Sequence, residues 1–302
     1  MDTNLSIQTH SGRFHTDDVT AVVILLLAHK TTIHDSKLSL VRSRDLSSIQ
    51  ENTYVVDVGG VYDPEKRIFD HHQKGGTGMR ESGIPYSSAG LVWKEFGLSI
   101  SDNNPDIYER IDTEFITPID AHDNGIDWNK SDVVFNPLTL QSVMVDFIPS
   151  WKHYSEENLL QGFKDAVAYT YTILQNRILH LLDEVEGEAL VEEIHTQSDR
   201  KEILVLDKKY PWHRVCDRHK EILFVISPDF STGNWTLHSV RKDIHSFESR
   251  CALPEEWAGK RDKKLQEVTG VADAVFVHNK RFIAVAESKE GVLALAHKAL
   301  QQ

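Results

Sequence analysis

Four clusters of aspartate and histidine occur in the first half of the chain. They are the segment from His10 to Asp18, Asp57, the triplet Asp70-His71-His72, and the segment from Asp120 to Asn124. Imidazole and carboxylate ligands together suit Mn²⁺, Mg²⁺ or Zn²⁺, and no cysteine lies near them to favour zinc. A carboxylate such as Asp57 can bridge two cations, and two cations roughly 3.5–4 Å apart stabilise the attacking and leaving oxygens of a phosphoryl transfer. The clusters therefore indicate metal-dependent phosphoryl chemistry.

Each cluster taken alone also has a simpler interpretation. An aspartate after a strand is more often a turn or cap residue, and a pair of histidines more often fills a surface or a core. The Asp120–Gly125 segment could be a helix stop, because Asn124-Gly125 suits a left-handed turn. The segment His10–Asp18 is as consistent with a ligand site as with a loop. The four clusters in one chain are harder to explain in this way.

The elements around these clusters favour a sheet that brings them together. Leu5–Thr9 reads as a strand, Val19–Ala28 as a buried helix with Asp17 and Asp18 in its first turn, and Lys37–Arg42 and Thr53–Val58 as further strands. This order is typical of βα units on a mostly parallel sheet. Ligands bind beyond the carboxyl ends of such strands, where three of the clusters lie, so we expect one cleft.

The rest of the chain predicts two domains. Helices are expected at about 87–96, 104–120 and 156–195, and Gly75–Pro85 is the most loop-like stretch. After Gln197, five short apolar runs and a final helix at 290–299 follow. We therefore predict an α/β fold: a mostly parallel sheet with flanking helices in residues 1–195, and a smaller α/β domain in residues 196–302.

The net charge of the chain limits the kinds of nucleic acid that the protein is expected to bind. The chain has 302 residues with 33 Lys/Arg and 46 Asp/Glu, so the net charge is −13. Residues 1–150 hold 12 basic and 22 acidic residues, against 21 and 24 in the remainder. A broad grip on duplex DNA is disfavoured because such surfaces are basic, whereas a local basic groove stays compatible with this charge. The acidic first half fits carboxylates around cations, although a solvated acidic surface explains the charge equally well.

The predicted cellular location depends on the cysteines, the length of the apolar runs and the first residues of the chain. Cys216 and Cys251 cannot form a disulfide framework or a four-thiolate zinc site. The longest apolar run, Ala21–Ala28, is far shorter than the ~20 residues of a membrane span. Residues 1–8 lack the pattern of a signal or transit peptide. We expect a cytoplasmic protein without a membrane partner.

The order of these motifs resembles the DHH phosphoesterase superfamily, and more closely the melanocyte-proliferating-gene exonuclease family within it. The motifs that carry the resemblance are Thr9-His10-Ser-Gly-Arg-Phe-His15-Thr-Asp17-Asp18, Asp57-Val-Gly-Gly-Val-Tyr-Asp-Pro, Phe69-Asp70-His71-His72-Gln73, Ser87-Ser88-Ala89-Gly90 and Ile119-Asp120-Ala-His-Asp123-Asn124-Gly125-Ile126. In the second domain, Phe247-Glu-Ser-Arg250-Cys-Ala-Leu-Pro254 with Trp257, and Val275-Phe276-Val277-His278, agree as well. The resemblance spans nearly the whole chain.

The resemblance implies roles for individual residues. One cation would be held by His10, His15 and Asp57, and the other by Asp17, Asp57, His71 and either Asp123 or Asp120. The catalytic group would comprise His72, at the phosphate or leaving group, with Asp57 and Asp18. Substrate contacts would come from Ser87, Ser88, Arg250 and Trp257, the last as a stacking surface.

One departure from the family pattern bears on the substrate. The last strand of the family carries Phe-Ile-Gly-Gly, a glycine pair that lets substrate approach the backbone, whereas this chain has Phe282-Ile283-Ala284-Val285. A short or different substrate becomes more plausible as a result.

These observations predict a divalent-metal-dependent phosphodiester hydrolase, a 3′→5′ exonuclease on RNA or short oligonucleotides. It would use two cations, Mn²⁺ before Mg²⁺, to activate the attacking water. Two alternatives remain: a phosphohydrolase of dinucleotides, cyclic dinucleotides or pyrophosphate, and a non-catalytic nucleotide-binding protein. RNA or a short oligonucleotide is the expected partner, and a homodimer is one expected assembly.

Overall fold

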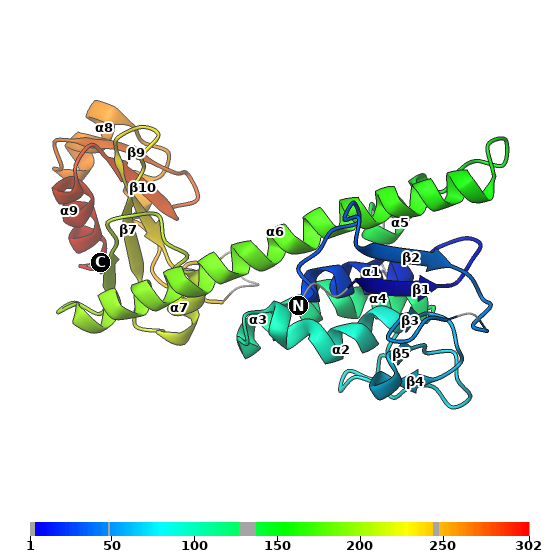
Figure 1. Ribbon diagram of the computed structural model, residues 1–302. Coiled ribbons are helices and arrows are strands. Elements are labelled where there is room, and N and C mark those ends of the chain that lie inside the picture. Colours follow the sequence, from blue (N-terminus) through cyan, green and yellow to red (C-terminus); the bar gives the residue numbers. More distant parts are fainter. Residues whose placement is uncertain (1–3, 48, 127–136, 244–247, 302) are drawn as a thin grey trace. The chain divides into compact units, whose positions relative to one another are not determined.

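The structure is a computed structural model that describes residues 4–47, 49–126, 137–243 and 248–301 (Figure 1). The chain divides into two compact units, Met1–Leu182 and Asp183–Gln302. The division falls inside the long helix α6 (Glu156–Gln197), and the domain boundary predicted near residue 195 lies in the same helix. Phe247, part of the motif in the second domain, lies outside the described residues.

The first unit is built on a five-stranded sheet with the order β2-β1-β3-β5-β4. β1 pairs in parallel with β2 and β3, and β3 pairs in parallel with β5, whereas β4 is antiparallel to β5. The carboxyl ends of β1, β3 and β5 therefore meet at one edge of the sheet. The strands are β1 (Leu5–Thr9), β2 (Leu38–Arg42), β3 (Tyr54–Val56), β4 (Tyr62–Asp63) and β5 (Ile68–Phe69).

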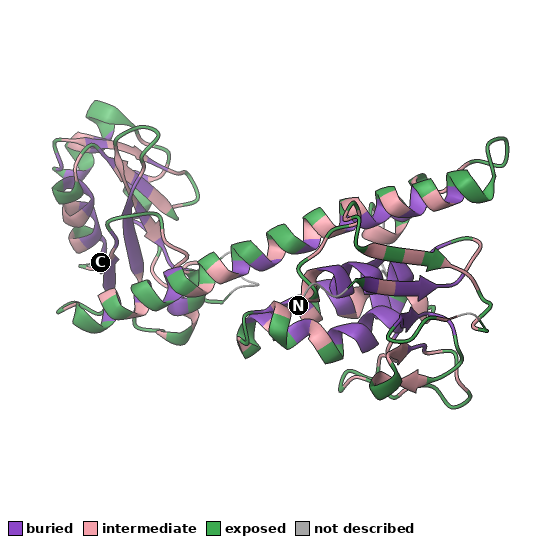
Figure 2. Cartoon of the chain, viewed as in Figure 1, coloured by how far each residue is buried: buried purple, intermediate pink, exposed green. Residues whose placement is uncertain are grey.

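Helices flank this sheet, and the central one is buried along most of its length. Helix α1 (Thr16–Ala28) packs against α2 (Ser88–Ile100) and α4 (Thr117–Asp123), and its residues 16–26 are all buried (Figure 2). An apolar run such as Val19–Leu26 is expected of a helix enclosed by its neighbours. The other helical segments in the described part of this unit are a 3₁₀ turn at Pro64–Lys66, α3 (Pro105–Ile111), a π-helical turn at Asp112–Ile116, α5 (Leu140–Asp146) and the first part of α6.

The second unit has its own five-stranded sheet, ordered β6-β7-β8-β10-β9, in which only the β6–β7 pair is parallel. Buried residues from β7, β8, β9 and β10 pack with α8 and α9 into a core that includes Phe224, Leu265 and Leu295. The elements are β6 (Ile203–Val205), α7 (His213–Arg218), β7 (Phe224–Pro228), β8 (Trp235–Ser239), a 3₁₀ turn (Glu255–Trp257), α8 (Asp262–Thr269), β9 (Ala274–Val277), β10 (Ile283–Ala286) and α9 (Lys289–Ala299).

The predicted fold class is confirmed. The mostly parallel sheet, the flanking helices and a smaller α/β unit are all present. The helix expected at 104–120 is instead three consecutive helical segments, with the π turn between α3 and α4. The two-residue strand β4 and the short helices α5, α7 and α8 were not predicted, since short elements carry little periodicity.

Candidate active site

The carboxyl ends of three parallel strands carry the clustered residues. His10 follows β1, Asp57 follows β3 closely, and the Asp70-His71-His72 triplet follows β5. Asp57 has φ +56°, a conformation that side chains other than glycine adopt rarely and mostly at special sites. Its carboxylate is thereby directed by a backbone turn at the sheet edge rather than by strand geometry.

The first turn of α1 adds two buried carboxylates. Asp17 and Asp18 are 1% and 0% exposed, respectively, because α1 is enclosed by its neighbours. Asp18 Oδ1 accepts a hydrogen bond from the backbone N–H of His15 at 2.8 Å, which fixes the start of the helix. Asp18 Oδ2 lies 3.2 Å from His10 Nε2.

Two groups of potential ligands share Asp57. His10, His15 and Asp57 offer ligand atoms within 4.8 Å of one another, and His10 Nε2 lies 3.3 Å from Asp57 Oδ2. On the other side, His71 Nε2 lies 3.4 Å from Asp57 Oδ1 and 3.2 Å from Asp123 Oδ2. Each oxygen of Asp57 therefore faces a different imidazole, an arrangement suited to a bridging carboxylate.

Several buried atoms of this cluster have no hydrogen-bond partner among the described residues. They are both carboxylate oxygens of Asp17, Asp18 Oδ2, His10 Nε2 and His71 Nε2. A buried, unsatisfied carboxylate is costly, and paired charges or a metal are the usual remedies. Because the unsatisfied atoms are hard oxygens and imidazole nitrogens, the residues present fit divalent cations.

The electrostatics reflect this crowding of like charges. Burial together with the charges of Asp57, Asp123 and Asp18 raises the pKa of Asp17 well above its usual value. Burial lowers the pKa of His10, but the nearby carboxylates of Asp18 and Asp57, at 3.2 and 3.3 Å from Nε2, outweigh it and raise the pKa to about 10. The proton on the His10 imidazole therefore offsets the negative charge of the surrounding carboxylates, which is the role that a bound cation would have.

The structure separates Asp120 from the cluster. Asp120 Oδ1 accepts hydrogen bonds from Ser87 Oγ at 2.7 Å and from the Gly90 N–H at 3.1 Å, and Oδ2 accepts from Arg80 Nε at 2.7 Å. Asp123, in contrast, reaches His71. Of the two aspartates left open by the sequence, Asp123 is the one whose carboxylate lies beside His71.

The two serine hydroxyls that were expected to contact substrate donate hydrogen bonds to carboxylates in this structure. Ser87 is bonded to Asp120, and Ser88 Oγ donates to Asp57 Oδ1 at 3.1 Å, and both serines are 0% exposed. The expected direct contact of Ser87 and Ser88 with substrate is therefore not supported. Their observed role is to position Asp120 and Asp57.

Two further substrate contacts also need correction. Trp257 is 3% exposed and belongs to the core of the second unit, so it offers no face for base stacking. Arg250 donates to the carbonyl oxygens of Cys216, His219 and Ile222 at 2.7–2.9 Å. It therefore holds backbone together instead of presenting a cation to phosphate.

Asp70 and Arg44 lie at the site without an individual role predicted from the sequence. Asp70 Oδ1 lies 2.8 Å from His72 Nδ1 and accepts the His72 N–H at 3.1 Å, so it orients the imidazole, whose side chain is 63% exposed. Arg44 lines the cavity of the site and contacts His10 Nδ1 at 3.3 Å. Asp70 belongs to the motif Asp70-His71-His72, so the sequence could have indicated it. No motif in the neighbouring sequence indicates Arg44.

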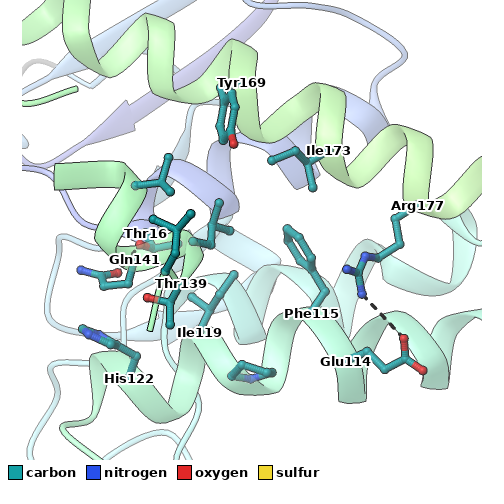
Figure 3. A pocket seen from close by; sticks show the side chains of 14 residues that line it. Thr16, Glu114, Phe115, Ile119, His122, Thr139, Gln141, Tyr169, Ile173 and Arg177 are labelled. Atoms are coloured by element: carbon teal, nitrogen blue, oxygen red, sulfur yellow. Dashed lines mark hydrogen bonds and ion pairs between the residues drawn. The ribbon is translucent and has the colours of Figure 1, made fainter. Parts of the chain in front are cut away.

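Other cavities in each unit are distinct from this site. In the first unit, a cavity of about 500 Å³ lies between α4, α5 and α6, where Arg177 pairs with Glu114 and His122 points in from α4 (Figure 3). It shares no residue with the lining of the clustered site. In the second unit, a cavity of about 740 Å³ combines cations and aromatic rings: Lys209, Arg241, Lys280, Trp212, His213, His238, His278 and Phe282.

The fold and the site together define a two-unit α/β protein with a buried aspartate–histidine cluster at the carboxyl edge of a mostly parallel sheet. The chain belongs to the MYG1 family: the MYG1_exonuc family model, described as an uncharacterised protein family (UPF0160), matches residues 6–300.

Similar proteins come from distant organisms. A Dictyostelium discoideum "MYG1 protein" is 35% identical, with 99% of this chain and 97% of that protein aligned. A Homo sapiens "MYG1 exonuclease" is 34% identical, with 98% and 86% aligned. A solved structure of RecJ with Mn²⁺ from Thermus thermophilus aligns over 99% of this chain and 52% of its own, at 13% identity. Its TM-score of 0.28 is too low to bear on the site.

Among the described residues, no helix is both long and apolar enough to cross a membrane.

Proposed function

We propose that this protein is a divalent-metal-dependent phosphodiester hydrolase, a 3′→5′ exonuclease that acts on RNA or short oligonucleotides. The observation that carries the proposal is Asp57, whose two oxygens face His10 and His71 beside the unpartnered carboxylate of Asp17. The family relationship agrees, since relatives carry the name exonuclease. We propose Mn²⁺ as the preferred metal.

The residues divide into two ligand sets. His10, His15 and Asp57 would hold one cation, and Asp17, Asp57, His71 and Asp123 the other. When bound, the two cations would lower the pKa of a water molecule and offset the charge that develops on the phosphate. Asp18 would hold His10 in place, and Ser88 would hold Asp57.

His72 has the geometry of a group that meets the substrate. Its imidazole is exposed at the rim of the cavity. Asp70 Oδ1 contacts both the imidazole Nδ1 and the backbone N–H of His72, and so holds this residue in place. Nδ1 carries the hydrogen that Asp70 accepts, so the opposite ring nitrogen would donate to a phosphate or leaving oxygen only when both ring nitrogens carry a proton. Arg44 in the same cavity would add a positive charge for the phosphate.

Cations and aromatic rings in the second unit would contact the nucleotides. The cavity lined by Lys209, Arg241, Lys280, Trp212 and Phe282 offers charge for phosphates and rings for bases. We therefore propose that residues of this cavity, and not Arg250 and Trp257, contact the substrate.

The test is hydrolysis of a 5′-labelled short RNA with Mn²⁺, followed on a sequencing gel. The wild type should yield a ladder that shortens from the 3′ end, and EDTA or Asp57→Asn should abolish it. Asparagine tolerates the left-handed backbone of Asp57, so the fold should survive. Asp102→Asn is the matched control, because Asp102 is an exposed aspartate with φ +54°. If D57N retained metal and hydrolysis, the proposal would be wrong.

A second candidate is hydrolysis of a dinucleotide, a cyclic dinucleotide or pyrophosphate. The net charge of −13 and the side chains of Ala284 and Val285 in place of a glycine pair favour a small substrate. Salt discriminates between the candidates, since binding of a long strand weakens steeply as salt rises.

Two further statements belong to the same proposal. We propose that the protein acts in the cytoplasm, where free thiols such as Cys216 and Cys251 persist. A homodimer stays a prediction, which light scattering of the purified protein would check.

A further inference from the structure

A second cluster of histidine and glutamate lies in the second unit, away from the residues of the candidate active site. It consists of His195 in the last turn of α6, His219 directly after α7, and Glu221 before β7. Their ligand atoms all lie within 4.8 Å of one another, and the two imidazole centroids are 4.4 Å apart. Two segments of the chain, the end of α6 and the connection between α7 and β7, therefore converge on one point.

The distances within the cluster fit a common cation. Glu221 Oε1 lies 3.0 Å from His195 Nε2 and 3.3 Å from His219 Nδ1. Ligands about 2.0–2.2 Å from a tetrahedral ion are separated by distances close to these. His195 is 4% exposed, whereas the Glu221 side chain is 47% exposed, so the cluster has both a rigid side and an entrance.

Hydrogen bonding of His219 turns a lone pair toward Glu221. His219 Nε2 lies 2.6 Å from Glu192 Oε2, a distance that requires Nε2 to carry the hydrogen. In neutral imidazole, Nδ1 is then an acceptor, and it faces a carboxylate oxygen at 3.3 Å. Two acceptors oppose each other unless a proton or a metal ion lies between them.

The surroundings hold the ligands in this orientation. Arg218 Nε donates to Glu192 Oε1 at 2.8 Å, so the carboxylate that orients His219 is itself fixed. Arg250 donates to the carbonyl oxygen of His219 at 2.9 Å. A metal-bound histidine that donates its other N–H to a carboxylate is a recurrent arrangement in metalloproteins.

We propose that His195 Nε2, His219 Nδ1 and Glu221 Oε1 bind one Zn²⁺ ion, with Glu192 as the residue that positions His219. Two imidazoles and one carboxylate suit zinc and leave one position open for water. The ion would tie the end of α6 to the segment between α7 and β7, and so would stabilise the second unit.

The experiment measures the zinc content of the full chain after equilibrium dialysis against Zn²⁺. Wild type should retain one more zinc ion per chain than Glu221→Gln or His219→Asn. Glu221 is half exposed, so E221Q keeps the shape and should fold, which circular dichroism would verify. His180→Asn, an exposed histidine on the same helix α6, is the matched control and should bind zinc as the wild type does.

The orienting carboxylate supplies a second readout. Glu192→Gln should weaken zinc affinity by about 10- to 100-fold without removing the site. Zinc should also raise the melting temperature of wild type more than that of E221Q. Equal zinc content in wild type, E221Q and H219N would overturn the proposal.

Discussion

Asp17 is the residue on which the metal-free and metal-bound states should differ most. Its carboxylate is buried and unpartnered, and burial together with the charges of neighbouring carboxylates raises its pKa well above the usual value, so the metal-free folded state disfavours the ionised form. Asp17→Asn should therefore stabilise the metal-free protein, by on the order of 1–3 kcal/mol. The same variant should lose most of the stabilisation that Mn²⁺ confers on wild type.

Thermal unfolding with EDTA and with Mn²⁺ measures both effects. Asp63→Asn is a suitable control, because Asp63 lies outside the site and pairs with the exposed Lys66. A D17N protein less stable than wild type in EDTA would contradict this account of the carboxylate.

Asp70 acts on the reaction through His72. Asp70→Asn removes the charge that orients the imidazole, and we expect the turnover rate to fall by about 10- to 100-fold. Because neither metal ligand set contains Asp70, metal content should stay the same. If D70N lowered the rate of a His72→Ala variant by the same factor as it lowers that of wild type, Asp70 would not be acting through His72.

At the scale of elements, a glycine sets the distance between α2 and α4. A Cβ on Gly90 would clash with the carboxylate of Asp120, and the Gly90 N–H donates to the same carboxylate. Gly90→Ala should destabilise the protein by about 1–3 kcal/mol, since the clash breaks the contact of Asp120 with α2. Chemical denaturation measures the loss, and Ser99→Ala, at an exposed position of α2, should change stability little.

Strand β8 carries a histidine that makes stability depend on pH. Burial, with help from His213 and Lys209, lowers the pKa of His238 to about 4. The unfolded chain binds this proton near pH 6.5 and the folded chain only near 4, so stability is lost as pH falls from 6.5 toward 4. The loss attributable to His238 at pH 5 should be about 1–2 kcal/mol.

Urea unfolding at pH 7 and pH 5 tests this dependence. His238→Gln should lose less stability than wild type between the two values. An identical loss in both proteins would show that His238 is not the responsible group.

At the scale of the whole molecule, the two units should respond differently to metal. The first unit holds the acidic site, so Mn²⁺ added to EDTA-treated protein should slow amide hydrogen exchange in α1 and in segments 10–15, 57–60 and 70–73. Protection in β7, β8 and β10 of the second unit should stay the same. Uniform protection across both units would contradict a Mn²⁺ site confined to the first unit, because the histidine–glutamate cluster proposed in the second unit takes Zn²⁺.

The sequence by itself determined the fold class and the family, and it predicted most of the residues that the structure gathers into the candidate site. Apolar runs of two different periods marked strands and helices, and motifs such as Asp70-His71-His72 stand at strand ends that a parallel sheet must align. These signals are local, because each depends on a few neighbouring residues.

Tertiary structure decided which polar groups face the cavity and which are hydrogen-bonded to other parts of the protein. Asp120 and Asp123 lie one helical turn apart in one motif, yet only packing against α2 turns Asp120 toward Ser87 and Gly90 and leaves Asp123 beside His71. Burial likewise assigned Trp257 to a core. The cluster of His195, His219 and Glu221 joins segments more than 20 residues apart in the sequence, so no spacing pattern could reveal it.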